Sequence, residues 1–503
     1  MQEKDVKAFI AKQRRYAQIY QKDTKGTDVE YGKWCGKLKD VHCLIGREEI
    51  DDDPLVIAPR GCPFNSAVLA SSGIPNWYTI IHGTRGCSGM LKYFIDSFAG
   101  SFRGDPHIVT TDIGKVDAIL GGEAKLKDAI IEIDRDHHPD AIVILKSCAP
   151  SVIGDDMNGV CDGLKDKVGC ALVPVDMTSI SSRHLGLGRD HLLLAIAEHI
   201  IKPPKEKIPN TVNVLGDSSA LHPPEMRPDN DPEEYRRVLG DMVHSFIPGR
   251  EPVSTLETAS TVALNVLTCG VAGLGAARYM EKEFGIPWIT VNRPIGIAAT
   301  TQYYTAIIDA LGLGEKAEKV LAREILETDK AIEPYRQKLQ GKTIAISLAS
   351  GRAVGNVLAS LELGLKPVYI GLHAMHEKLF PGLEVLQQEL EERGFDPEIL
   401  TEPDFYDEVA VLERLKPDIW YCDSSQKNEA VRHGQPYLMC MAEAWGYPTL
   451  GFKGTIPWAE QTVRVVENAR IYQELGAPHM YVPGLPCSYD TCSLADVDCE
   501  TSG

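Results

Sequence analysis

The stretch AKLKDAIIEIDRDHHPDAIVILKS (124–147) decides the fold class, because a helix pattern is followed directly by a strand pattern. Apolar residues in its first part recur at helical spacing, and AIVILKS (141–147) is a short apolar run typical of a buried strand. Similar strand-like runs occur at PLVIAP (54–59), WYTIIHG (77–83), VDAILGG (116–122) and CALVPVD (170–176). This alternation predicts βαβ units, parallel sheets and an α/β fold.

Two changes of pattern predict domain boundaries within the 503 residues. The Pro- and Lys-rich stretch IKPPKEKIPN (201–210) precedes a new strand pattern, and near residue 340 a charged helical segment gives way to TIAISLASGRAVGN (343–356). We therefore expect three doubly wound, Rossmann-like α/β domains, with ligands at the strand-end loops. The predicted segments are a helical lead-in at 1–49, domains at 50–208, 209–339 and 340–480, and an irregular tail at 481–503.

Composition and charge exclude several classes of partner. The net charge of −19 argues against a nucleic-acid groove. The N-terminal segment MQEKDVKAFI (1–10) is too polar for a signal peptide, and no run of about 18 apolar residues occurs. We expect a cytoplasmic protein with no nucleic-acid or membrane partner, whose partners are small molecules and other proteins.

A glycine-rich turn in VALNVLTCGVAGLGAARYM (262–280) partly matches the dinucleotide-binding fingerprint. Arg278 stands where the third glycine is required, and the next strand ends in Asn292 instead of a ribose-binding carboxylate. A tight turn with close helix packing is therefore the better interpretation of Gly273 and Gly275. No GxxxxGK[ST] loop occurs, so this chain is not expected to hydrolyse ATP.

Three cysteines share one kind of position, at predicted strand ends beside glycine or proline. They are Cys62 in RGCP, Cys87 in RGCSG and Cys148 in SCAP. Taken singly, a cysteine is more often a small buried side chain than a ligand. Three thiolates from separate strand ends together suit an iron–sulfur cluster, because iron prefers soft sulfur ligands.

The order of motifs around these cysteines resembles one family. The succession RGC (60–62), HGTRGC (82–87), TTDIGKVDAILGGEAKL (110–126) and SCAPSVIGDD (147–156) resembles the first domain of nitrogenase alpha and beta subunits and their cofactor-assembly relatives. The resemblance implies that the three cysteines supply half of the ligands of a P-cluster-type [8Fe-7S] cluster. It also implies a beta-type partner subunit in an α2β2 assembly, and an ATP-hydrolysing iron protein with a [4Fe-4S] cluster as electron donor.

The second and third domains extend the resemblance to an active-site cofactor. LNVLTCGVAGLGAARYMEKEFGIPW (264–288) resembles the alpha-subunit stretch whose cysteine ligates one end of that cofactor, which implies this role for Cys269. At the position of the histidine that ligates the opposite end stands Met441, beside Cys440. A thioether is a weak ligand and Cys440 offers a thiolate, although both residues also suit a core. Arg352 in ASGRAVGN is expected either to face an anionic cluster or to anchor the turn.

Further departures separate this chain from molybdenum nitrogenase. In SSRHLGLGRDH (181–191), Arg183 and Leu187 stand where the family has a cofactor-facing glutamine and a proton-delivering histidine. For the neighbouring His184 and His191 a surface or packing role is expected first, and proton donation in place of the lost histidine is the alternative. Ser425 replaces the lysine that holds homocitrate. These changes imply an all-iron iron–sulfur–carbide cofactor without homocitrate and disfavour dinitrogen reduction.

The sequence leaves more than one function open. An alpha-type catalytic subunit resembling methylthio-alkane reductase, which cleaves C–S bonds to methanethiol and hydrocarbon, is the first hypothesis. A cofactor-assembly scaffold that binds a cofactor precursor is the second, because such proteins also keep the four cysteines and lack the histidine. An unconventional nitrogenase alpha subunit and a tetrapyrrole reductase are further alternatives. The tail cysteines Cys487, Cys492 and Cys499 carry only a weak metal hypothesis.

Overall fold

The chain forms two units, of which one contains two sheets and the other one sheet in the described residues. The computed structural model describes residues 1–21, 34–37, 62–71, 73–89, 107–177, 185–216, 232–240, 243–247, 251–268, 272–373, 382–403, 405–422, 426–439 and 449–475. One unit consists of Gly61–Thr290 and Ala310–Gly312, and the other of Met1–Arg60, Val291–Asp309 and Leu313–Gly503.

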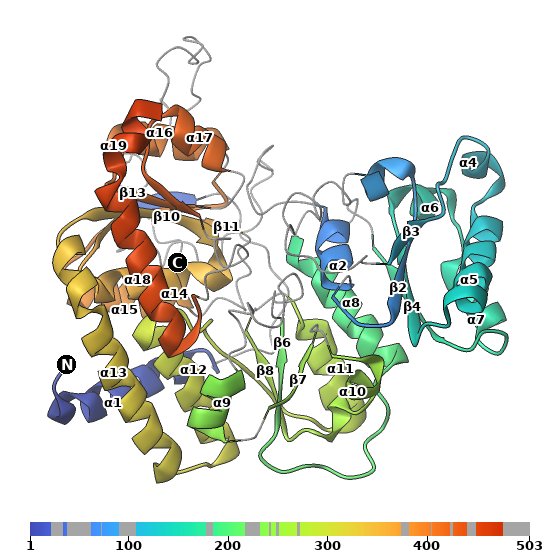
Figure 1. The fold of residues 1–503 in the computed structure, drawn as a ribbon, viewed down its shortest axis with the longest axis horizontal. Coiled ribbons are helices and arrows are strands. Elements are labelled where there is room, and N and C mark those ends of the chain that lie inside the picture. Colours follow the sequence, from blue (N-terminus) through green and yellow to red (C-terminus); the bar gives the residue numbers. More distant parts are fainter. Residues whose placement is uncertain are drawn as a thin grey trace, which may run out of the picture. The chain divides into compact units, whose positions relative to one another are not determined.

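The first sheet of the Gly61–Thr290 unit is parallel, with strand order β3-β2-β4-β5. Its strands are β2 (Trp77–His82), β3 (Ile108–Thr110), β4 (Ala141–Lys146) and β5 (Ala171–Asp176). Helices α5 (Glu123–His137) and α7 (Met157–Leu164) cover one face, and α2 (Pro63–Ser71) and α8 (Leu185–His199) cover the other (Figure 1). Helix α5 buries Leu126, Ile130 and Ile133, whose spacing places them on one side of the helix.

The second sheet of this unit is also parallel and has the order β7-β6-β8-β9. Its strands are β6 (Val212–Leu215), β7 (Val243–Ile247), β8 (Leu264–Leu267) and β9 (Trp288–Thr290). Helices α9 (Pro232–Leu239), α10 (Val253–Glu257) and α11 (Leu274–Phe284) accompany these strands. Helix α8 contacts α2 and β5 around the first sheet and α11 beside the second sheet. It therefore packs against elements of both sheets.

The other unit has one mixed sheet of order β1-β12-β11-β10-β13-β14. Its strands are β1 (Trp34–Lys37), β10 (Thr343–Ala349), β11 (Lys366–His373), β12 (Glu398–Thr401), β13 (Ile419–Cys422) and β14 (Tyr437–Met439). Strand β1 pairs antiparallel with β12, and the other strands are parallel to their neighbours. The accompanying helices include α14 (Ser350–Glu362), α15 (Gly382–Glu392), α16 (Phe405–Leu415), α17 (Lys427–Arg432) and α19 (Ala469–Leu475).

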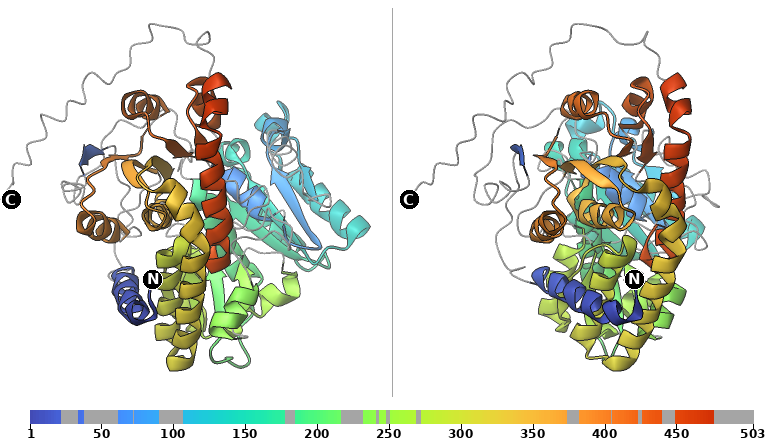
Figure 2. Two further views of the ribbon diagram at one scale, coloured as in Figure 1. Left: turned by 60° about the vertical axis from the view of Figure 1, so that its left-hand side comes forward. Right: turned by 90° about the vertical axis from the view of Figure 1, so that its left-hand side faces the viewer.

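Long helices complete this unit. Helix α13 (Glu315–Leu339) packs against both α1 (Glu3–Ile19) and α18 (Gly451–Glu467), and Figure 2 shows this group from two sides. Helix α12 (Gly296–Leu311) is buried over most of its length. No helix in the described ranges is both long and apolar enough to cross a membrane.

The structure confirms the α/β fold class with parallel sheets and corrects one predicted strand. VDAILGG does not form a strand, because residues Asp117–Leu120 form the short helix α4, none of whose residues is buried. The apolar positions 116, 119 and 120 already follow helical spacing. PLVIAP lies outside the described residues. The domain boundaries at 208 and 339 stay predictions.

Candidate functional site

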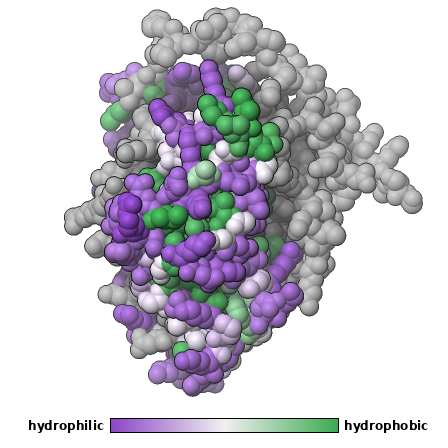
Figure 3. Space-filling model, turned by 90° about the vertical axis from the view of Figure 1, so that its right-hand side faces the viewer, coloured by the Kyte–Doolittle hydropathy of each residue, from purple (hydrophilic) through white to green (hydrophobic). Residues whose placement is uncertain are grey.

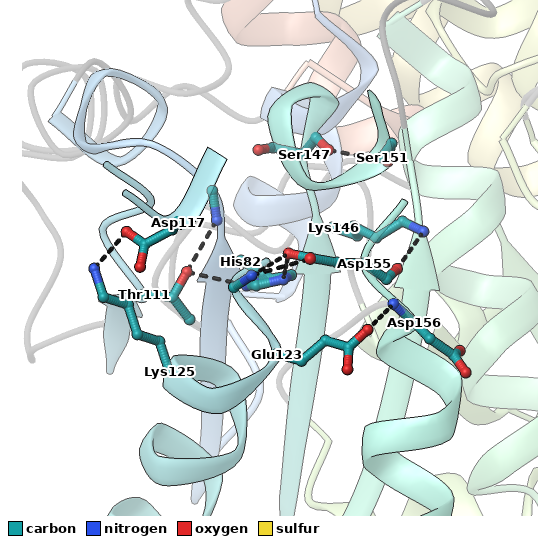
Figure 4. A network of polar contacts seen from close by, with 12 residues as sticks. His82, Thr111, Asp117, Glu123, Lys125, Lys146, Ser147, Ser151, Asp155 and Asp156 are labelled. Atoms are coloured by element: carbon teal, nitrogen blue, oxygen red, sulfur yellow. Dashed lines mark hydrogen bonds and ion pairs between the residues drawn. The ribbon is translucent and has the colours of Figure 1, made fainter. Parts of the chain in front are cut away.

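A buried hydrogen-bond network joins the motif loops of the first sheet (Figure 4). His82 ends β2, and its Nε2 lies 3.0 Å from Oδ2 of Asp155, which belongs to the IGDD motif between α6 (Cys148–Ile153) and α7. On the other side of the ring, Nδ1 lies 3.0 Å from Oγ1 of Thr111, just after β3. The ends of two neighbouring strands and one loop are therefore connected through a single imidazole.

Asp155 also accepts hydrogen bonds from the backbone at the start of α5. Both carboxylate oxygens lie 3.0 Å from the backbone nitrogen of Gly122, and next to it the Asp156 amide donates to Glu123 at 2.8 Å. A Cβ at Gly122 would lie 2.3 Å from Cδ1 of Ile113 and 2.8 Å from Asp155. The second glycine of LGG is therefore required by close packing, and LGG and IGDD meet in one structural contact.

His82 is a neutral structural histidine. Thr111 Oγ1 accepts from the Gly83 amide, so its hydroxyl proton is free to donate to Nδ1, and Nε2–H donates to Asp155. Burial lowers the pKa of His82 below its ordinary value and outweighs the opposite influence of Asp155. Both ring nitrogens are satisfied by protein groups.

Cys87 and Cys148 follow neighbouring strands at one edge of this sheet. His82 and Lys146, the last residues of β2 and β4, are register partners. The two following loops touch, because a Cβ at Gly83 would lie 2.2 Å from Oγ of Ser147. Cys87 lies in the helical residues 85–89 and Cys148 begins α6, so both side chains start from helix beginnings where strand-end loops were expected. Thr84 donates to Cys87 Sγ at 3.7 Å.

Cys62 directly precedes α2, and α8 packs closely against the start of α2. A Cβ at Gly188 would lie only 1.7 Å from the carbonyl oxygen of Pro63, so a larger residue at 188 would displace the start of α2. The glycine in α8 thus permits close approach to the segment that carries Cys62. Within the described part of the unit, Cys62, Cys87 and Cys148 are half-buried.

Two other cysteines of the same sheet region have a different environment. Cys161 and Cys170 lie in the hydrophobic core, and burial raises the pKa of each thiol to about 12. Such thiols are inert packing residues. The contrast supports the donor chemistry expected for Cys62, Cys87 and Cys148, since thiolate ligands suit iron and clusters are held by cysteines. Among the described residues, no three His, Cys, Asp or Glu side chains form a single-ion metal site.

The glycine-rich turn of the second sheet is occupied by a carboxylate of the protein itself. Asp190 of α8 accepts from the backbone amides of Gly273 and Gly275 at 2.8 and 2.9 Å, where a dinucleotide phosphate would bind in a true fingerprint. Gly273 has a φ of 103°, and a Cβ at Gly275 would lie 2.9 Å from Asp190. The tight-turn interpretation of these glycines is confirmed. Burial raises the pKa of Asp190 above its ordinary value.

Of the remaining predicted site residues, the structure describes Arg352 and Leu187, and the others lie outside the described residues. Arg352 is described and occupies the first turn of α14 at the carboxyl end of β10, half-buried. Leu187 is half-buried in α8. The residues whose placement is not described are Arg183, His184, Cys269, Ser425, Cys440, Met441, Cys487, Cys492 and Cys499. Their roles stay predictions.

Sequence patterns alone assign no role to His82, Asp155 or Asp190. A histidine that directly follows an apolar strand was a usable signal for His82. Asp155 and Asp190 find their partners 33 and 83 or 85 residues away, and nothing local in the sequence indicates such contacts.

The fold and the half-buried cysteines define an α/β protein with candidate ligands for an iron–sulfur cluster. A family model described as nitrogenase component 1 type oxidoreductase matches residues 62–467. The chain belongs to this family.

Similar proteins include both cofactor biosynthesis proteins and nitrogenase alpha chains. The nitrogenase iron-molybdenum cofactor biosynthesis protein NifE of Methanococcus maripaludis is 25% identical over 412 residues, covering 78% of this chain and 82% of that protein. The nitrogenase molybdenum-iron protein alpha chain of Methanosarcina barkeri is 29% identical over 355 residues, covering 68% and 65%. The solved structure described as nitrogenase Cp1 at pH 5 has a TM-score of 0.71 at 23% identity, covering 86% and 94%, and shares the fold.

Removing the Asp155 carboxylate is expected to destabilise the first sheet region selectively. Asp155→Ala leaves the buried Gly122 and His82 donors without an acceptor, which costs about 3 kcal/mol. The neighbouring Asp156 only caps α7 through the Gly159 amide, so Asp156→Ala is the matched control and costs about 1 kcal/mol. Hydrogen exchange of β2 and α5 measures both. Equal effects of the two variants would contradict the assigned role of Asp155.

The lowered pKa of His82 predicts acid sensitivity. The unfolded chain, with a histidine pKa of about 6.5, takes up the proton at a higher pH than the folded state. Stability from neutral His82 is therefore complete above about pH 6.5 and falls on acidification by at most about 1.4 kcal/mol per pH unit. Exchange of residues 77–83, compared between wild type and His82→Gln at pH 7.5 and 5.5, measures this. Parallel pH dependences would refute it.

Thiol accessibility should separate the candidate ligands from the core cysteines. In folded protein from which metal has been removed by chelation, we expect alkylation of Cys62, Cys87 and Cys148 to be at least about tenfold faster than that of Cys161 and Cys170. Quantitative mass spectrometry under anaerobic conditions gives the five rates, with urea-unfolded protein as the reference. Comparable native rates for Cys148 and Cys161 would remove this support for the ligand assignment.

Proposed function

We propose that the chain is the alpha-type, catalytic subunit of a nitrogenase-like, ATP-dependent iron–sulfur reductase that cleaves the C–S bond of methylthio-alkanes. The reaction takes a thioether, two electrons and two protons, and yields methanethiol and a hydrocarbon. Membership of the nitrogenase component 1 type family supports the oxidoreductase class. The C–S specificity rests on the departures from nitrogenase at Arg183, Leu187 and Met441.

In this proposal Cys62, Cys87 and Cys148 bind half of an [8Fe-7S] P-cluster, and a beta-type subunit supplies the rest in an α2β2 assembly. The half-buried positions of the three cysteines support the assignment. Cys87 and Cys148 also follow β2 and β4 at the carboxyl edge of the first sheet, where ligands of open parallel sheets gather. The network of His82 and Asp155 keeps the cysteine-bearing loops in place.

The observation that carries the proposal is an exposed apolar surface beside the Cys148 helix. Three of its members, Val116, Ile119 and Leu120, lie on or beside α4 and are 66, 83 and 79% exposed. Val152 of α6 is 72% exposed, and α6 begins at Cys148 and contacts α4. Figure 3 shows apolar side chains gathered near the top of this face. Exposed apolar groups of this kind mark protein-binding surfaces.

This surface suits docking of the electron-donating iron protein with its [4Fe-4S] cluster. A donor bound over α4 and α6 would lie next to the helix that presents Cys148, which shortens the path for electrons into the P-cluster. The donor, and not this chain, hydrolyses ATP, which agrees with the absence of a phosphate-binding loop motif from the sequence.

The proposal includes a second metal group besides the P-cluster. Cys269 would hold an all-iron iron–sulfur–carbide cofactor without homocitrate, with Arg352, Cys440 and Met441 as its further protein contacts. The cofactor supplies electrons to the C–S bond when bound. Arg183 and His184 are the proposed polar groups for substrate positioning and proton delivery.

A scaffold for cofactor assembly is the second candidate, favoured by the similarity to NifE proteins over most of both chains. It would bind a cofactor precursor without turnover. An unconventional nitrogenase alpha subunit would instead reduce dinitrogen. Anaerobic co-purification with the partner subunit, metal analysis, and assay with iron protein, ATP, dithionite and a methylthio-alkane separate these functions. Methanethiol release supports the reductase, whereas a bound cluster without turnover supports the scaffold.

A charge placed on the apolar surface should interrupt electron delivery. Ile119→Asp is expected to lower iron-protein-dependent methanethiol formation at least about tenfold, because a buried carboxylate at the docking interface is not compensated. Iron content and the P-cluster signal should remain. Ile131→Asp on α5, 39% exposed in wild type, is the matched control and should retain activity. Equal rates for both variants would place docking elsewhere.

A further inference from the structure

A buried polar cluster lies at the carboxyl ends of β10 and β11, outside the residues assigned so far. Ser347 belongs to β10, His373 is the last residue of β11, Glu408 lies in α16, and Gln426 directly precedes α17. None is more than 1% exposed. Ligands of α/β proteins bind at the carboxyl ends of parallel strands, and Arg352 lies in the first turn of the helix after β10 at the same edge.

The contacts of the cluster assign its protons. Glu408 accepts from the Ser347 hydroxyl and from the Gln426 amide, and that amide also lies 3.1 Å from Ser347 Oγ. His373 Nε2 lies 2.7 Å from Ser347 Oγ and 3.1 Å from Glu408 Oε1. Because the serine proton points to the carboxylate, Nε2 must carry the proton that it shares with these oxygens. Nδ1 is then a lone-pair nitrogen.

Nδ1 of His373 is buried and has no hydrogen-bond partner in the described structure. Burying an unused acceptor is unfavourable, so this atom is expected to meet a ligand. His82 is the internal comparison, since that ring has a carboxylate on Nε2 and a threonine on Nδ1. The two histidines share a carboxylate partner and differ in the second nitrogen.

Gly371, two residues before His373 in β11, leaves room for the polar cluster because it has no side chain. A Cβ at Gly371 of β11 would lie 3.0 Å from Ser347 Oγ and 3.2 Å from Glu408 Oε1. Glycine inside a strand is intrinsically unfavourable, and close approach of other groups is its usual reason. The sheet therefore accommodates the polar groups that orient His373.

We propose that His373 is a protein ligand, through Nδ1, to an iron atom of the resident iron–sulfur cofactor. A metal-binding histidine characteristically donates its other ring N–H to a carboxylate, which fixes the tautomer and raises the basicity of the ligating nitrogen. Glu408 is that carboxylate, and Ser347 and Gln426 hold it in place. One imidazole would suffice, because the sulfides of an iron–sulfur cluster would supply the other ligands of the iron.

The inference rests on the proposed function only in that the chain binds a cofactor besides the P-cluster. It does not depend on the substrate. The site differs from the predicted positions Cys440 and Met441, and it restores an imidazole to a chain in which methionine stands at the family histidine position.

The test is pulsed electron paramagnetic resonance of anaerobically purified complex containing 14N- or 15N-labelled histidine. A histidine nitrogen coupled to the cofactor signal is expected in wild type and should be lost in His373→Gln. The P-cluster signal should persist in the variant, which shows that it has folded. His82→Gln is the matched control and should keep the coupling.

A second variant tests the orienting role of Glu408. Glu408→Gln retains the size of the side chain and removes the charge that fixes the Nε2–H tautomer, so the nitrogen coupling should weaken and cofactor iron per protein should fall about twofold or more. Wild-type coupling in both variants, or a cofactor signal without histidine coupling, would overturn the inference, as would the absence of any iron beyond the P-cluster. Coupling without methanethiol formation would instead count against the reductase proposal alone.

Discussion

The packing of helix α8 is the constraint on which the Gly61–Thr290 unit depends. Gly188 allows the helix to touch the carbonyl of Pro63, directly after Cys62, and Asp190 accepts the amides of Gly273 and Gly275, shortly after Cys269. Two positions on one rigid helix thus contact both cysteine-bearing segments. A side chain at 188 or the loss of the carboxylate at 190 would change the spacing between them, so the glycine and the aspartate have structural roles.

The motifs of the first sheet likewise position the segments that carry cysteines. Three motifs, HG, LGG and IGDD, meet through His82, Gly122 and Asp155. None of these three residues is placed to act as a metal ligand, because hydrogen bonds within the network satisfy their polar atoms. What the motifs achieve is the fixed position of the loops that carry Cys87 and Cys148. A charged carboxylate with several donors is well suited to this, since such hydrogen bonds are strong when shielded from water.

The predictable part of the structure was the part set by local pattern. The alternation of apolar strands and amphipathic helices predicted the α/β class and the β10–α14 segment, because burial on one or both faces leaves a periodic signal. VDAILGG was misjudged as a strand although its apolar positions 116, 119 and 120 follow helical spacing, because the apolar run is short and its exposure cannot be read from the sequence. The Asp190 and Asp155 contacts join residues distant in sequence, so they depend on tertiary packing and leave no local trace. Helix beginnings at Cys87 and Cys148 were also missed, since a strand-end loop and a short helix share glycine and proline signals.

The two buried histidines show why residue type and burial alone do not define a site. Each ends a strand that is parallel to both of its neighbours, and each has a carboxylate within 3.1 Å of Nε2. At His82 a threonine occupies the second nitrogen, and the ring is complete as a structural link. At His373 the serine, glutamate and glutamine all gather on the Nε2 side, which leaves Nδ1 as the only ring atom able to bind a ligand. The environment of the second nitrogen therefore distinguishes a structural histidine from a candidate ligand within one chain.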